Sequence, residues 1–176
     1  MSYIVVDVEA DGPIPSLYSM VSFGAVIVEP SLTKAFYGTV KPISDSYIPE
    51  ALAVSNISRE EHLAFAEPEI VMANFFNWIK TNSVGNPIFI SDNPAFDWQW
   101  INFYFHAYTT KGNPFGHSAR RIGDLYCGMK MDTGLNHEWK KKLRKTKHTH
   151  NPVDDAMGNA EALLAMKSMG LKINLT

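Results

Sequence analysis

The chain has 176 residues, of which 45% are hydrophobic and 12% aromatic, and its formal net charge is −2. This length predicts a single globular domain, residues 1–176, and the near-neutral charge identifies no partner. The single cysteine, Cys127, excludes an intrachain disulfide framework and a cysteine-rich zinc site. The sequence has neither a signal-peptide pattern nor an apolar window long enough to cross a bilayer, so we expect a cytoplasmic protein without a membrane partner.

Strand-like segments dominate the first ninety or so residues. Residues 3–8, 19–30 and 34–42 are rich in β-branched and aromatic side chains and are separated by turn-forming residues. They predict three strands in an antiparallel meander. Residues 67–81 place apolar side chains at helical spacing and predict a helix, and the apolar run at residues 86–91 predicts a short buried strand.

Helices are expected in much of the second half. The predicted helices at residues 93–108 and 151–170 each begin with an Asn that suits the N-cap and a Pro that suits the first helical position. Residues 109–118 are predicted to form a loop, and residues 120–131 fit either a strand or the edge of a helix. This order of elements predicts a layered α/β or α+β domain.

The first predicted strand carries two carboxylates on one face. Residues two apart in a strand share a face, so Asp7 and Glu9 point one way while Val6 and Val8 point the other. Two unpaired buried carboxylates would be costly and would repel each other, so we expect a Lys, an Arg or a divalent cation beside them. The alternative is a strand end at which Glu9 is solvated and Asp7 caps a turn.

Further acidic residues lie at the starts of two predicted helices. Asp97 is one turn into an otherwise aromatic helix, where the helix macrodipole alone would favour a carboxylate. Asp154 and Asp155 occupy the first turn of the last helix, shortly after His150. Asp154 suits a capping role, which leaves Asp155 the freer of the two. Taken singly, each residue is explained by capping, with His150 in a surface loop.

Taken together, four acidic residues from three segments and one histidine suit two-metal phosphodiester cleavage. Oxygen ligands suit hard cations such as Mg²⁺ or Mn²⁺. Two ions roughly 3.5–4 Å apart can stabilise both the attacking and the leaving oxygen of an in-line displacement. A histidine outside the ligand set can take the proton from the attacking water.

Three motifs, in order, resemble those of the DEDDh 3′-5′ exonucleases, the group of RNase T, oligoribonuclease and the proofreading subunit of bacterial DNA polymerase. Asp7-Val8-Glu9 matches the first motif, "NPAFD" places Asp97 in the second, and "HNPVDDA" places His150 and Asp155 in the third. The resemblance covers nearly the whole chain. It implies a ribonuclease H-like fold, with a mixed central sheet flanked by helices. It also implies two Mg²⁺ or Mn²⁺ ions on Asp7, Glu9, Asp97 and Asp155, with His150 as the general base, all five residues being catalytic.

A narrower resemblance links "DVEADGP", "SFGAVIVEP", "ALAVSNISREE" and "RIGDLYCGM" to a small group of bacterial and phage 3′-5′ exoribonucleases. It implies single-stranded RNA as the substrate, nucleoside 5′-monophosphates as products, and a homodimer. Two departures from the wider family pattern are Ala10, where many relatives have Thr, and Pro152, where many have Ala. Neither is expected to remove the chemistry, but Ala10 bears on how the terminal nucleotide is held. His148 lies seven residues before Asp155, so His150 fits the base position better.

Residues expected to bind substrate flank the motifs. Leu17 and Met20 follow the catalytic strand and are predicted to pack against the terminal base or sugar, and Asn93 is a further predicted contact. Lys145 and Lys147 belong to a basic segment, residues 139–147, which holds six of the sixteen Lys and Arg. This segment is either a phosphate-binding patch or a solvated helix face.

Two alternative functions stay open at the level of sequence. No residue clearly reads a 2′-hydroxyl, so the same chemistry could act on single-stranded DNA. The fold could also serve as a non-catalytic nucleic-acid-binding module, although the five filled catalytic positions argue against it. The sequence does not choose between Mg²⁺ and Mn²⁺, nor does it define the physiological target or its length.

Overall fold

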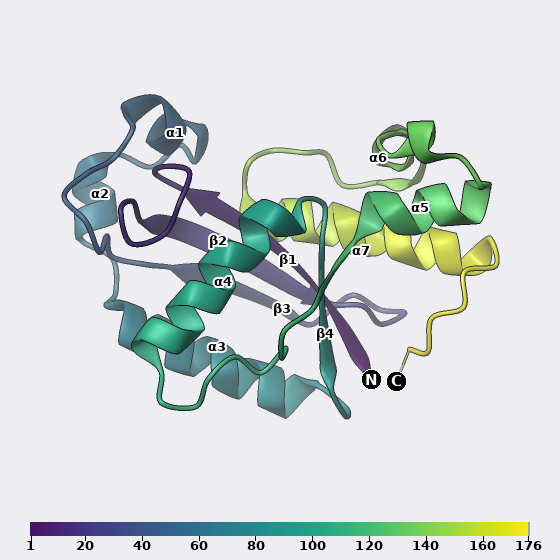
Figure 1. The fold of residues 1–176 in the computed structure, drawn as a ribbon, viewed down its shortest axis with the longest axis horizontal. Helices are drawn as coiled ribbons and strands as arrows, with labels where there is room; N and C mark the ends of the chain where they lie inside the picture. Colours follow the sequence, from purple (N-terminus) through teal and green to yellow (C-terminus); the bar gives the residue numbers. More distant parts are fainter. Residues whose placement is uncertain (176) are drawn as a thin grey trace.

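A computed structural model describes residues 1–175 and has a five-stranded mixed sheet between two layers of helices (Figure 1). The strands are β1 (Ser2–Ala10), β2 (Met20–Ile27), β3 (Ala35–Thr39), β4 (Pro87–Ser91) and β5 (Ala119–Arg121). The helices are α1 (Pro49–Val54), α2 (Arg59–Leu63), α3 (Pro68–Asn82), α4 (Pro94–Tyr108), α5 (Ile122–Lys130), α6 (Glu138–Leu143) and α7 (Pro152–Ser168), with the 3-10 helix η1 (Thr133–Leu135). Within the described residues, we find no helix that could span a bilayer.

The strand order is β3-β2-β1-β4-β5, which puts the strand with the two carboxylates at the centre of the sheet. The predicted meander is confirmed, because β1 pairs antiparallel with β2 and β2 pairs antiparallel with β3. β4 lies parallel to β1, and β5 lies parallel to β4. The ambiguous stretch at residues 120–131 contains both predicted alternatives, since β5 leads directly into α5.

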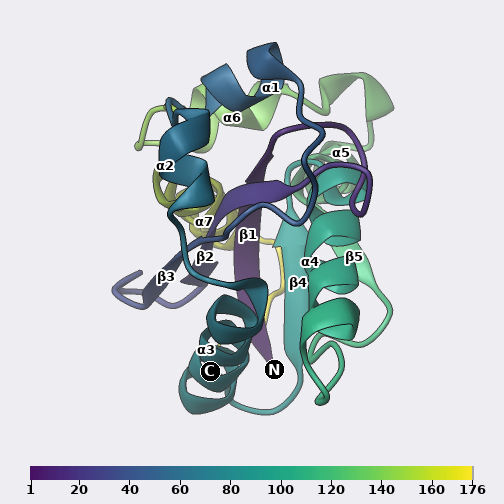
Figure 2. The same ribbon diagram turned by 90° about the vertical axis from the view of Figure 1, so that its left-hand side faces the viewer.

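The alternation of side chains along β1 separates two hydrophobic cores. Ile4, Val6 and Val8 pack against α3 and α4, whereas Val5 packs on the opposite face with α5, α6 and α7. The helices α4 and α7 accordingly lie on opposite faces of the sheet (Figures 1 and 2). Asp7 and Glu9 share the face of Val5, so their side chains point toward the α7 layer.

Two short helices that the sequence analysis missed follow β3 and lie beyond the carboxyl end of β1 (Figure 2). Local signals for both were present: Pro49 is at the first turn of α1, and Ser58 and Glu61 form a capping box at α2. A partly buried charge pair ties α2 to the end of β1, because Arg59 donates to the carboxylate of Asp11, the residue after the strand, over 3.0 Å. This end of β1 is therefore enclosed by α1 and α2.

Candidate active site

The close approach of α7 to the sheet depends on Gly24. This residue is paired with Asp7 across the β1–β2 ladder. A Cβ atom on Gly24 would lie 2.3 Å from the backbone carbonyl of Pro152, in the first turn of α7. Because no side chain intervenes, the N-terminus of α7 can lie directly on the strand beside the carboxylate of Asp7.

The start of α7 places a third carboxylate beside the two on β1. The Asn151 side chain caps the helix by accepting from the backbone N–H groups of Val153 and Asp154, as predicted. Ligand oxygens of Asp7, Glu9 and Asp155 then all lie within 4.8 Å of one another. Asp154 instead accepts from the hydroxyl of Thr149, over 3.1 Å, outside this group.

Asp97 reaches the same place from the opposite side of the sheet. β4 pairs with β1 only as far as Val5, so the backbone N–H of Val8 is free to donate to the Asp97 carboxylate, over 3.1 Å. Asn93 occupies the predicted N-cap position of α4 and is followed by Pro94, but its side chain makes no capping hydrogen bond. Its backbone carbonyl accepts from the Asp97 N–H instead. Asp7, Glu9, Asp97 and Asp155 are called the carboxylate cluster below.

The electrostatics of the carboxylate cluster favour a bound cation. Burial, and then the negative charges of Asp97 and Asp155, hold the pKa of Asp7 well above its ordinary value. Burial, and then Asp155, raise the pKa of Glu9 to about 7. Burial likewise raises the pKa of Asp97. A divalent cation would offset this repulsion, and an all-oxygen donor set fits Mg²⁺ or Mn²⁺.

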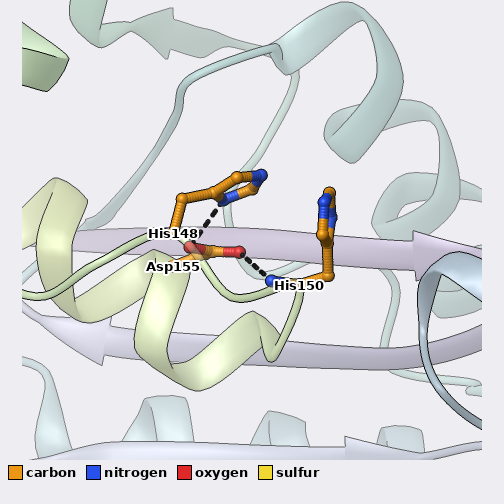
Figure 3. Close-up of side chains that lie close together, drawn as sticks. All are labelled: His148, His150 and Asp155. Carbon is orange, nitrogen blue, oxygen red and sulfur yellow. Dashed lines mark hydrogen bonds and ion pairs between the residues drawn. The ribbon is translucent and has the colours of Figure 1, made fainter.

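Two histidines, His148 and His150, lie next to each other beside the Asp155 carboxylate (Figure 3). His150 donates its backbone N–H to Asp155 over 3.1 Å and has a left-handed backbone, with φ 59°. Its ring, 46% exposed, lies with Nδ1 3.6 Å from the carboxylate of Glu9. The Nδ1 atom of His148 lies 2.7 Å from Asp155, and the two rings are 4.3 Å apart. The structure thus brings His148 to the site as well, which spacing in the sequence did not indicate.

The basic segment is fastened to α7 by two acidic side chains. Arg144 donates to Asp155 over 2.9 Å and is almost fully buried. Glu161 accepts from the backbone N–H groups of Lys145 and Thr146. Against the effect of its partial burial, these hydrogen bonds hold the pKa of Glu161 below its ordinary value. The chain leading to His148 and His150 is therefore held in a defined position.

Two cavities of opposite character flank the carboxylate cluster. The basic cavity, about 290 Å³, includes Asp7 in its lining, and the apolar cavity, about 400 Å³, includes Glu9. The rest of the basic cavity is lined by Asp92, Lys140, Lys141, Arg144, Lys145, Thr146, Lys147, His148 and Asn159. The rest of the apolar cavity is lined by Ala10, Gly12, Pro13, Ile48, Ala51, Val54 and Phe96.

Only some of the predicted substrate-binding residues line one of the two cavities. Lys145 and Lys147 line the basic cavity. Leu17 is 51% exposed in the loop that follows β1, and Asn93 is exposed but lines neither cavity. The prediction for Met20 is wrong: its side chain is fully buried in the core, so it cannot contact a nucleotide. No helix was predicted from the sequence at α1, so the α1 wall of the apolar cavity was not expected.

A family model described as the Rv2179c-like 3′-5′ exoribonuclease domain matches residues 2–166 of the chain. The chain belongs to this family. Among curated proteins, the 3′-5′ DNA exonuclease Cap18 of Escherichia coli is 43% identical over 133 residues, which cover 72% of this chain and 68% of that protein. The chain is therefore a 3′-5′ exonuclease of the DEDDh type, as the motifs predicted.

Solved structures confirm the predicted ribonuclease H-like fold. The nuclease domain of 3′hExo, a DEDDh family member bound to rAMP, has a TM-score of 0.79 at 15% identity, covering 99% of this chain and 96% of that chain. E. coli Exonuclease I in complex with a dT13 oligonucleotide has a TM-score of 0.67 at 15% identity, covering 96% of this chain and 41% of that chain. At such identities the likeness concerns the fold.

Proposed function

We propose that this exonuclease is a metal-dependent exoribonuclease, which removes nucleoside 5′-monophosphates from the 3′ end of single-stranded RNA. The observation that carries the proposal is the convergence of the carboxylate cluster and His150 between an apolar and a basic cavity. A terminal base suits the apolar side, and the phosphates of the remaining strand suit the basic side.

The chain's own groups account for the hydrolysis. Asp7, Glu9, Asp97 and Asp155 would hold two Mg²⁺ or Mn²⁺ ions, which supply charge stabilisation to the attacking and leaving oxygens. His150 accepts the proton of the attacking water, for which its ring lies on the Glu9 side of the carboxylate cluster. The bond from water oxygen to phosphorus forms, the bond from phosphorus to O3′ breaks, and O3′ takes up a proton from solvent.

Arg144 serves this arrangement by orienting a carboxylate. It donates to one oxygen of Asp155, and the backbone N–H of His150 donates to the other. A carboxylate held at both oxygens is fixed in orientation before any cation binds. Arg144 is thus proposed as a positioning residue of the active site.

RNA is the proposed substrate. Single-stranded DNA is the second candidate, because the matching family and one relative are named for different nucleic acids. The matching family is described as exoribonucleases, whereas the relative Cap18 is named a DNA exonuclease. The homodimer is part of the same proposal and rests on the resemblance of the motifs alone; light scattering at working concentration tests it.

The test uses matched 5′-labelled RNA and DNA oligonucleotides of one sequence. Purified protein is incubated with Mg²⁺, with Mn²⁺ and with chelator, beside the Asp7→Asn and His150→Ala variants. The proposal requires a ladder that shortens from the 3′ end, depends on the added metal, is lost in both variants, and forms faster on RNA. If DNA is shortened as fast as RNA or faster, the assignment of RNA as the substrate is wrong and single-stranded DNA takes its place.

A further inference from the structure

The basic cavity contains a buried acceptor that no protein group satisfies. The side chain of Asn159 is 1% exposed, and its carbonyl oxygen has no hydrogen-bond partner. Among residues 1–175, the Asn159 oxygen is the only buried side-chain polar atom without a partner that belongs to a residue lining this cavity. Buried polar atoms in native proteins nearly always have a partner, so a ligand in the cavity is expected to supply one.

The position of Asn159 relates it directly to the active site. It lies one helical turn after Asp155, on the same face of α7, and lines the cavity together with Asp7. Arg144 forms the adjoining wall, pressed so closely onto α7 that a Cβ on Gly158 would lie 2.4 Å from its Nε. Asn159 therefore lies at the floor of the basic cavity, beneath the space between the carboxylates and the lysines.

The proposed path of the strand determines which part of the substrate enters this space. With the terminal base in the apolar cavity beside Glu9 and the cleaved bond at the carboxylate cluster, the next nucleotide toward the 5′ end enters the cavity beside Asp7. The phosphodiester and ring oxygens of its backbone only accept hydrogen bonds. Its ribose 2′-hydroxyl can donate, and this group is present in every ribonucleotide but absent from DNA.

We infer that the Asn159 carbonyl accepts a hydrogen bond from the 2′-hydroxyl of the nucleotide on the 5′ side of the cleaved bond, which makes Asn159 a specificity-determining residue for RNA. This inference rests on the proposed exonuclease function and adds the group that reads the sugar. Loss of one hydrogen bond between uncharged groups corresponds to roughly a threefold to tenfold change in kcat/KM.

The experiment changes one sugar and one side chain. The substrates are oligonucleotides that differ only at the penultimate sugar, which is ribose, 2′-deoxyribose or 2′-fluoro-2′-deoxyribose. First-turnover kcat/KM is measured for wild type and Asn159→Ala. Replacing the hydroxyl also changes the acidity of the leaving O3′, but that contribution is common to both proteins. The ratio of the sugar preference of wild type to that of Asn159→Ala therefore measures the contribution of Asn159 alone.

The inference requires that wild type prefer ribose and that Asn159→Ala reduce this preference about threefold to tenfold. Ser83→Ala, which removes another unpartnered buried oxygen from a residue that does not line the cavity, should keep the wild-type preference. An unchanged preference in Asn159→Ala, or an equal loss on all three substrates, would overturn the inference.

Wild type alone keeps the inference testable if Asn159→Ala does not fold. Binding affinity does not depend on the acidity of O3′, and fluorine cannot donate a hydrogen bond. With Ca²⁺ in place of Mg²⁺ to slow cleavage, wild type must therefore bind the 2′-fluoro oligonucleotide about threefold to tenfold more weakly than the ribose one; equal affinities would overturn the inference. If wild type shortened none of the oligonucleotides, the proposed function would fail. If it shortened all of them equally, only the reading of the sugar would fail.

Discussion

The two cavities beside the carboxylate cluster differ in both their lining and the way they are built. The apolar cavity is walled by α1, at the carboxyl end of β1, and has Ile48, Ala51 and Val54 in its lining. The basic cavity is walled by α6, the basic segment and α7, and has Lys141 and Lys145 in its lining. The difference indicates a direction for the strand: the flat faces of a base suit the first cavity, and charged phosphates suit the second.

The centre that both cavities share should give the largest effect when it is changed. Asp7→Asn is expected to lower kcat/KM by at least about a thousandfold, because several kcal/mol of charge stabilisation would be lost. The folded-state pKa of Asp7 is raised, so above its unfolded-state pKa the ionised side chain destabilises the metal-free protein. The thermal midpoint of Asp7→Asn in chelator at pH 7 should therefore equal or exceed that of wild type. Activity within tenfold of wild type would refute the role.

The two histidines provide a matched pair for the general base. His150→Ala should lower kcat by about 10²–10⁴-fold, the usual contribution of a positioned base. His148→Ala should cost less than about tenfold, because His148 pairs with Asp155, whereas His150 is the histidine beside Glu9. Single-turnover rates at saturating RNA would measure both, and the reverse order would assign the base to His148.

Substitutions in the wall of each cavity should have different effects on substrate binding. Ala51→Trp should fill the apolar cavity and raise KM by roughly five- to a hundredfold, the range for one stacked base, with little change in the salt dependence. The triple variant Lys141→Ala, Lys145→Ala and Lys147→Ala should instead flatten the plot of log affinity against log salt by about 2, since each lost phosphate contact contributes about 0.7.

A control for the triple variant is Lys172→Ala, because Lys172 lines neither cavity. Its salt dependence should equal that of wild type. If the triple variant also kept the wild-type slope, the strand would not run through the basic cavity.

Two glycines test how α7 is brought to the cluster. Gly24→Ala places a Cβ where the Pro152 backbone lies and should reduce the free energy of unfolding by about 1–3 kcal/mol, with lower activity. Gly128→Ala, in α5, meets no atom within 4 Å and should stabilise the protein by about 0.5–1 kcal/mol. Urea unfolding measures both. Equal effects would contradict the role of Gly24 as a spacer.

A buried histidine in α2 should make the free energy of unfolding depend on pH, and this effect should be smaller than those above. His62 in α2 is buried beside Asp11 and Arg59, and burial lowers its pKa from 6.5 to about 4. Between these values the unfolded chain binds a proton that the folded chain does not, so stability falls as the pH drops from about 6.5 to 4. The contribution is at most about 1.4 kcal/mol per pH unit. Urea unfolding at several pH values should show a shallower slope for His62→Gln, and an unchanged slope would exclude His62 as the cause.

Sequence patterns predicted the parts of the site that depend on local order. The alternation along β1 places Asp7 and Glu9 on one face, and the Asn–Pro start of α7 places Asp155 in its first turn. Long-range packing accounts for what was missed. The burial of Met20 follows from the packing of α3 and α4 on one face of the sheet. The approach of His148 to Asp155 and the position of Asn159 follow from how α7 lies on the other face. No spacing in the sequence reports either contact.

The most direct test of the strand's direction is a crystal structure of the wild-type protein with a short RNA, in which Ca²⁺ replaces Mg²⁺ to slow cleavage. The 3′-terminal base should lie against Ile48, Ala51 and Val54, with the scissile phosphate at the carboxylate cluster. The next ribose should then lie in the basic cavity. A terminal base among the lysines of the basic cavity, or a 5′ end in the apolar cavity, would contradict this direction.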